Sequence, residues 1–128
     1  MAKDIIYVQY PALDNTQSVG VKAITKAVVN PSNGVAVSKA FANKNNTLLI
    51  CVENTAESDS IVKFNAGDAY PNAMLGDLSL PVLAGTVTVF QIQDISRFEN
   101  KDGSLGIDFG EGFTGNIYAV AKSTALNV

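Results

Sequence analysis

Histidine and tryptophan are absent from this sequence of 128 residues, and cysteine occurs only once. Without histidine, the chain lacks the commonest general base of nucleophilic catalysis and the commonest metal ligand. The single cysteine, Cys51, lies in the apolar run TLLICVEN, where it can form no internal disulfide and is expected to pack as a small hydrophobe. Nucleotide-binding glycine patterns and a nucleophile elbow are missing too. We therefore expect neither an enzyme nor a cofactor.

Charge is also scarce. Asp, Glu, Lys and Arg make up 16% of the chain, and the formal net charge is −3. The nine basic residues form no stripe or arm, so nucleic acid is not an expected partner. No apolar run approaches the roughly 18 residues that a membrane span needs. The first ten residues, MAKDIIYVQY, lack the apolar core and cleavage site of an export signal, so secretion is not expected either.

The chain does contain many short runs of β-branched and aromatic residues, and 47% of it is hydrophobic, which is enough for a real core. Each run is bounded by Gly, Asn, Asp or Pro, a pattern typical of strands joined by turns. We predict one all-β domain over residues 1–128, an antiparallel β-sandwich or barrel-like sheet of about 7–8 short strands. The expected strands are 5–10, 34–41, 47–54, 60–66, 86–93, 104–109 and 116–122, with DLSLPVL (77–83) as an edge strand.

Two segments leave the pattern ambiguous. Residues 18–31 have the spacing of an amphipathic helix, but their β-branched content favours a strand, and both interpretations stay open. In TVTVFQIQ the apolar phase changes between Val89 and Phe90, which would fit a β-bulge.

The stretch RFENKDGSLGIDFGE, residues 97–111, resembles a calcium loop at first sight. Aligning Gly103 with the invariant glycine of an EF-hand loop puts phenylalanines at the first and last ligand positions, which excludes that motif. A looser site formed by Asp102, Asp108 and Glu111 stays open. Because Asp-Gly is a strong turn signal, we expect a hairpin without a metal, whose apolar positions feed the core.

Three segments carry a resemblance to a known family: AFANKNNTLLICVENTAESDSIVKF, GDLSLPVLAGTVTVFQI and SRFENKDGSLGIDFGEGFTGNIYAVA. Together, over residues 40–122, they resemble the small head proteins that tailed bacteriophages and prophages encode beside their major capsid genes. The family pattern is a T-x-L-x-V-x-N strand, a V-x-AG-T approach to a later strand and a DG hairpin near the C-terminus. The matching residues are Thr47, Leu49 and Asn54 (the Asn one position late), then Ala84, Gly85 and Thr86, and finally Asp102 with Gly103.

This resemblance implies a non-enzymatic virion protein that decorates or stabilises the capsid surface and is made in the host cytoplasm. The implied partners are the major capsid protein and further copies of the chain, as a homo-oligomer for which a trimer is one possibility. Residues 1–20 would then be an N-terminal assembly arm. The expected interface residues, whose apolar side chains would otherwise leave exposed patches, are Ile5, Tyr7, Tyr10, Tyr70, Met74 and Leu75.

Two other classes of function remain as alternatives. The first is a ligand-binding β-module for carbohydrate- or calcium-dependent adhesion, in which Tyr7, Tyr10, Tyr70 and Phe113 are candidates for stacking on sugar rings. The second is a small β-sandwich enzyme with an unrecognised pair of catalytic carboxylates.

Overall fold

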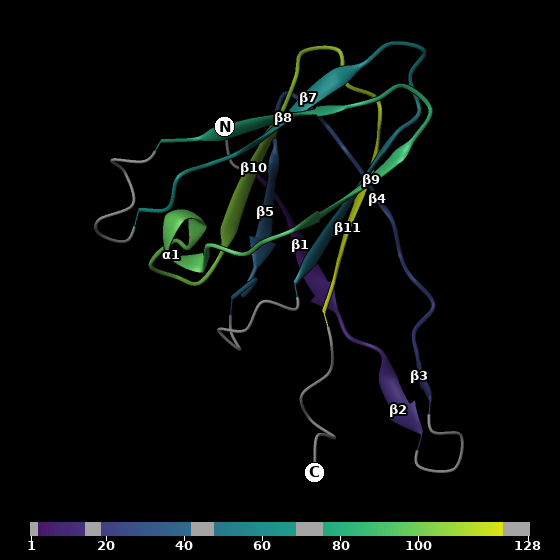
Figure 1. Cartoon of the computed structure of the whole chain (residues 1–128), viewed down its shortest axis with the longest axis vertical. Coiled ribbons are helices and arrows are strands. Elements are labelled where there is room, and N and C mark those ends of the chain that lie inside the picture. Colours follow the sequence, from purple (N-terminus) through teal and green to yellow (C-terminus); the bar gives the residue numbers. More distant parts are fainter. Residues whose placement is uncertain (1–2, 15–18, 42–47, 69–75, 122–128) are drawn as a thin grey trace.

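The computed structural model describes residues 3–14, 19–41, 48–68 and 76–121, and at 12–14 and 19–21 it describes the backbone alone. These residues form a strongly curved, nearly closed β-sheet with one short helix (Figure 1). No helix in the described ranges is long and apolar enough to cross a membrane. The elements are β1 Asp4–Gln9, β2 Ala12–Asp14, β3 Val19–Val21, β4 Ala27–Val28, β5 Val35–Ser38, β6 Leu49–Asn54, β7 Ser60–Phe64, β8 Leu78–Val82, β9 Val87–Gln91, α1 Ile95–Phe98, β10 Leu105–Phe109 and β11 Gly115–Val120.

The main sheet runs in the order β8-β7-β10-β5-β1-β11-β6-β9, and β4 also pairs with β11. The prediction of an all-β fold with a barrel-like sheet is therefore confirmed. A wholly antiparallel sheet is wrong, because β1 pairs in parallel with both β5 and β11. Parallel neighbours require a long crossover connection. Between β1 and β5, that connection is the stretch that contains β2, β3 and β4. The parallel direction of β1 depends on this connection and leaves no signal in the sequence of β1 itself.

The N-terminal segment divides into two parts. β1 is an inner strand of the sheet, whereas β2 and β3 pair only with each other as a separate two-stranded ribbon. Figure 1 shows this ribbon standing away from the sheet. The predicted arm over residues 1–20 therefore includes both an inner strand of the main sheet, β1, and part of a ribbon that pairs with no strand of that sheet. Residues 19–31 contain β3 and β4 and no helix, so the strand interpretation of this region is correct.

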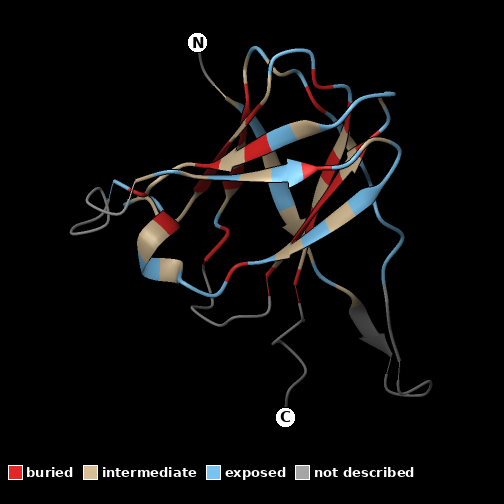
Figure 2. Cartoon of the chain, turned by 45° about the horizontal axis from the view of Figure 1, so that its top comes forward, coloured by how far each residue is buried: buried red, intermediate tan, exposed pale blue. Residues whose placement is uncertain are grey.

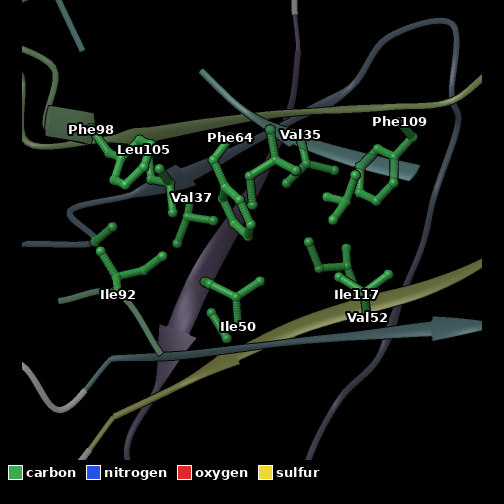
Figure 3. Close-up of a cluster of buried hydrophobic side chains, with 14 of the residues drawn as sticks. Val35, Val37, Ile50, Val52, Phe64, Ile92, Phe98, Leu105, Phe109 and Ile117 are labelled. Atoms are coloured by element: carbon green, nitrogen blue, oxygen red, sulfur yellow. The ribbon is translucent and has the colours of Figure 1, made fainter. Parts of the chain in front are cut away.

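The core fills the inside of the curved sheet (Figure 3). Along β10, Leu105, Ile107 and Phe109 are all buried, as their alternation predicts. Phe64 of β7 lies at the centre, with its ring 5.2 Å from that of Phe90 on β9. Each such side chain contributes about 1.5–3 kcal/mol when it is fully buried. The inward alternation of the strands is thus the main source of stability.

Two local predictions are corrected. The β6–β9 register runs without interruption, so there is no bulge between Val89 and Phe90, and the apolar phase changes because Val89 points outward. The Asp102–Gly103 turn is present, with Gly103 N donating to Asn100 O at 2.8 Å, but it does not form a hairpin. It joins α1 to β10, whose partners are β5 and β7.

The sheet stays open along one seam. Its end strands β8 and β9 are joined by the turn at residues 83–86 and diverge from it (Figure 1). At the narrow end, the buried side chain of Asn54 on β6 donates from Nδ2 to the carbonyl of Val82 on β8 at 3.0 Å. At the wide end the strands leave an apolar cleft of about 460 Å³ beside α1. The cleft is lined by Leu78, Leu80, Phe90, Ile92 and Phe98, among others.

Candidate functional site: an apolar face outside the barrel

The register of β11, β6 and β9 aligns their outward side chains in rows across the sheet. Tyr118 lies opposite Cys51, and Cys51 lies opposite Val89. β1 lies on the far side of β11 and pairs with it at Val8 and Gln9. Tyr7 points outward next to this contact, and Ile5 also points outward, further along β1 beside Ala36 of β5. We call this surface the outer apolar face, made of Ile5, Tyr7, Leu49, Cys51, Val87, Val89, Tyr118 and Val120.

Several members of the outer apolar face are open to solvent, as Figure 2 shows for the strands that carry them. Tyr7 is 68% exposed, Ile5 63% and Val89 56%. A solvated sheet face usually carries polar side chains at these positions. A contiguous apolar surface on the outside of a domain marks a place where something binds.

A shallow cavity of about 330 Å³ lies on this face, where β1, β4 and β11 meet. Tyr7 and Tyr118 both line it, together with Lys22. Its rim is held by Gln9, whose side-chain amide accepts from Thr25 N and donates to Thr25 O, both at 2.9 Å. The two hydrogen bonds from this side-chain amide take the place of backbone hydrogen bonds between β1 and the segment before β4. They hold that segment beside β1.

Polar groups border the face at one side. Glu53 accepts from Asn116 Nδ2 at 3.0 Å and pairs with Lys26 Nζ at 3.1 Å. The Asn116 hydrogen bond, followed by the contact with Lys26, lowers the pKa of the Glu53 carboxyl below its usual value. A charged, ordered margin around an apolar centre is the usual layout of a protein interface.

Cys51 lies within this face but is itself buried. Burial raises the pKa of its thiol, and this effect outweighs the hydrogen bond with Tyr118, which acts in the opposite direction. A thiol of raised pKa is a poor nucleophile. The expectation that Cys51 is a packing residue therefore agrees with its surroundings.

The six residues expected at an interface are only partly described. Ile5, Tyr7 and Tyr10 are exposed. Tyr70, Met74 and Leu75 lie outside the described residues. Sequence reasoning missed Val87 and Val89, although their alternation with Thr88 and Phe90 carried the signal. Phe113, a candidate for sugar stacking, is buried against Phe109 with ring centroids 4.9 Å apart.

Of the three candidate calcium ligands, Asp102 and Asp108 are engaged elsewhere, and Glu111 is an exposed residue of the turn between β10 and β11. Asp102 accepts from the backbone N of Ser104 at 3.0 Å, so it stabilises its own turn. Asp108 bonds to Lys3 and Asn65 instead. Across the described parts of the chain, no group of three or more His, Cys, Asp or Glu side chains is placed to hold a metal ion.

Comparison of the chain with family models, with curated proteins and with solved structures finds no match.

Proposed function

We propose that this chain is a non-enzymatic structural protein of a phage or prophage virion, which stabilises the capsid by binding neighbouring capsid subunits and further copies of itself. The observation that carries the proposal is the outer apolar face. No residue in the described part of the chain covers its exposed members, and an assembled lattice would supply a partner for them. The resemblance over residues 40–122 names the class of lattice.

The energetics of such a contact are favourable. Covering a large apolar side chain completely contributes about 1.5–3 kcal/mol, so Ile5, Tyr7 and Val89 together represent several kcal/mol before the cost of association. A ligand that binds only the assembled lattice stabilises that lattice by mass action. Repetition of the contact around an oligomer then multiplies the effect.

The β2–β3 ribbon supports the same interpretation. It stands away from the sheet and pairs with no strand of the barrel (Figure 1). A ribbon of this kind can reach an adjacent capsid subunit while the barrel stays bound to another one. In this proposal the ribbon and the outer apolar face contact different neighbours.

Co-sedimentation with capsids of the encoding phage or prophage tests the proposal. We expect the wild-type chain to pellet with capsids and Val89→Lys, combined with Tyr7→Lys, to stay in the supernatant. The matched control is Ile61→Lys, because Ile61 is a similarly exposed aliphatic residue on β7, away from the outer apolar face. Each variant should keep the wild-type circular dichroism spectrum, since the changed side chains point to solvent.

The outcomes separate the alternatives. A wild-type chain that is strictly monomeric and fails to bind capsids would contradict the proposed function. Loss of binding in Ile61→Lys, with binding kept in the Val89→Lys and Tyr7→Lys variant, would move the interface to the β7 side of the barrel.

One observation favours a second function, sugar binding. Tyr7 and Tyr118 line the same open cavity, and aromatic rings beside polar groups are the usual components of a carbohydrate site. A saturable response on a glycan array, abolished by Tyr118→Ala, would support this function. Capsid binding that survives Tyr118→Ala, together with a silent array, would exclude it.

A further inference from the structure

A second constellation lies on the opposite part of the outer surface, across β5, β10 and the end of β7. Its centre is the carboxylate of Asp108, which points outward from β10. Asp108 Oδ1 pairs with Lys3 Nζ, and Asp108 Oδ2 accepts from Asn65 Nδ2 at 2.9 Å. One carboxylate thus holds an amine and a carboxamide side by side.

The three residues come from distant parts of the chain. Lys3 precedes β1, Asn65 follows β7, and Asp108 lies on β10. Lys3 has to cross β5 to reach Asp108, because the sheet order is β7-β10-β5-β1. A long side chain laid across two strands would normally meet the side chains of the strands it crosses.

Two glycines leave the space that this crossing needs. A Cβ added to Gly34 would lie 2.7 Å from Asp108 Oδ1 and 3.0 Å from Lys3 Nζ. A Cβ added to Gly106 would lie 2.7 Å from Asn65 Oδ1 and 3.4 Å from Lys3 Cε. The end of the Lys3 side chain and the Asn65 carboxamide are therefore both next to the same point above Gly106.

We propose that Lys3 and Asn65 form an autocatalytic isopeptide bond, with Asp108 as the proton carrier. Lys3 is the nucleophile, the side-chain carbonyl carbon of Asn65 is the electrophile, and ammonia is the leaving group. This activity is independent of the proposed function, since it requires no partner. It would brace β1 covalently to β7 across the outside of the sheet.

The step balances without any co-reactant. The Asp108 carboxylate removes a proton from the Lys3 ammonium, and the free amine attacks Cγ of Asn65. Asp108 passes this first proton to Nδ2 of Asn65, the atom that already donates to Asp108 Oδ2. It then takes a second proton from Nζ and passes it to Nδ2 as well. The Nζ–Cγ bond forms, the Cγ–Nδ2 bond breaks, nitrogen leaves as ammonium and Asp108 is a carboxylate again. Holding both reactants on one carboxylate supplies the proximity.

The assignment of roles follows from the electrostatics. Burial raises the pKa of Asp108, but the hydrogen bonds from Lys3 and Asn65 and the positive charge of Lys3 outweigh it, so the net pKa is lowered. An ionised carboxylate is a poor electrophile, and at a lowered pKa it is only a weak base, so Asp108 takes up the Lys3 proton in a small fraction of molecules and the reaction is slow. A neutral carboxamide has a more electrophilic carbon, so Asn65 is the acceptor and Asp108 the proton carrier.

The test is the intact mass of the purified full chain after prolonged incubation at neutral pH. We expect a mass about 17 Da below that of the unreacted chain, the loss of one ammonia. Proteolysis followed by tandem mass spectrometry should yield a branched peptide that joins the Lys3 segment to the Asn65 segment. Lys3→Arg and Asn65→Ala should keep their full masses, and Asp108→Ala should keep both reactants unlinked. Asp108→Asn replaces Asp108→Ala if the alanine variant does not fold.

Each other result overturns the proposal. A full-mass wild-type chain with Lys3 unmodified would exclude the bond. A loss of about 17 Da that persists in Lys3→Arg would identify ring closure at an asparagine without any link to Lys3. A loss of about 18 Da with a link to Asp108 would reverse the assigned roles. Full reaction in a folded Asp108 variant would remove its part in the chemistry.

Discussion

At the scale of single residues, Asn54 is the polar group on which the closure of the barrel depends. It is completely buried. Its Nδ2 donates to Val82 O at 3.0 Å and to Ser58 O at 3.1 Å, and its Oδ1 accepts from Ala56 N at 3.0 Å. One side chain therefore joins β6, the turn that follows it and β8. A buried polar group is tolerated in a core only when it is satisfied in this way.

Asn54→Ala should lower the free energy of unfolding by about 3 kcal/mol, because it leaves buried backbone groups without partners. The matched control is Asn33→Ala, which removes one surface hydrogen bond to Asp4 and should cost less than about 1 kcal/mol. Urea unfolding followed by circular dichroism measures both. Equal midpoints for the two variants would contradict the role assigned to Asn54.

At the scale of elements, β1 has a different role from the ribbon that follows it. β1 pairs with β5 at four positions and with β11 at two, and so it connects the two halves of the sheet. The β2–β3 ribbon pairs with neither half. If residues 1–20 were an N-terminal arm, both β1 and the ribbon would be dispensable for folding.

Removing residues 1–9 should therefore abolish cooperative thermal unfolding, since β5 and β11 would then present unpaired edges to solvent. Replacing residues 12–21 by a short Gly-Ser linker should shift the melting temperature by only about 5 °C or less, because the barrel does not depend on the ribbon. Thermal melts followed by circular dichroism compare the two. A deletion of 1–9 that still melts cooperatively would show that β1 is dispensable.

At the scale of the whole molecule, the seam between β8 and β9 makes the barrel incomplete. Both strands are ends of the sheet (Figure 1). The cleft between their diverging parts is lined by core residues such as Phe64 and Phe98. The end strand β8 contains Pro81, which lies opposite Ile61 of β7. Proline has no amide hydrogen to donate to a further strand that adds to the sheet. This proline limits unwanted pairing along one edge.

The seam should be the least protected part of the barrel. We expect backbone amides of β8 to exchange with deuterium at least about ten times faster than those of β10, which is paired on both sides. Exchange measured by mass spectrometry or NMR on the free chain tests this. Equal protection of β8 and β10 would indicate that the seam is closed in solution.

Local properties of the sequence were sufficient for the eight longer strands of the main sheet and for the side chains that face the core, but not for β2 or α1. Alternation along SLGIDF placed Leu105, Ile107 and Phe109 inside, and Pro81 marked an edge strand, because both depend only on neighbouring residues. The sequence also predicted that Ile5 and Tyr7 are exposed. It did not identify the partner that would cover them.

Only the tertiary structure decided which strands are neighbours. Most paired strands of the main sheet are far apart in the sequence, and neither strand of such a pair carries a local signal that identifies its partner. The parallel position of β1 therefore had to come from the fold. The same holds for the outer apolar face, where the register brings Tyr118, Cys51 and Val89 together from three strands. It also holds for Asp108: in RFENKDGSLGIDFGE it is one more acidic residue, and its partners Lys3 and Asn65 reach it only when β1, β5, β10 and β7 pair side by side.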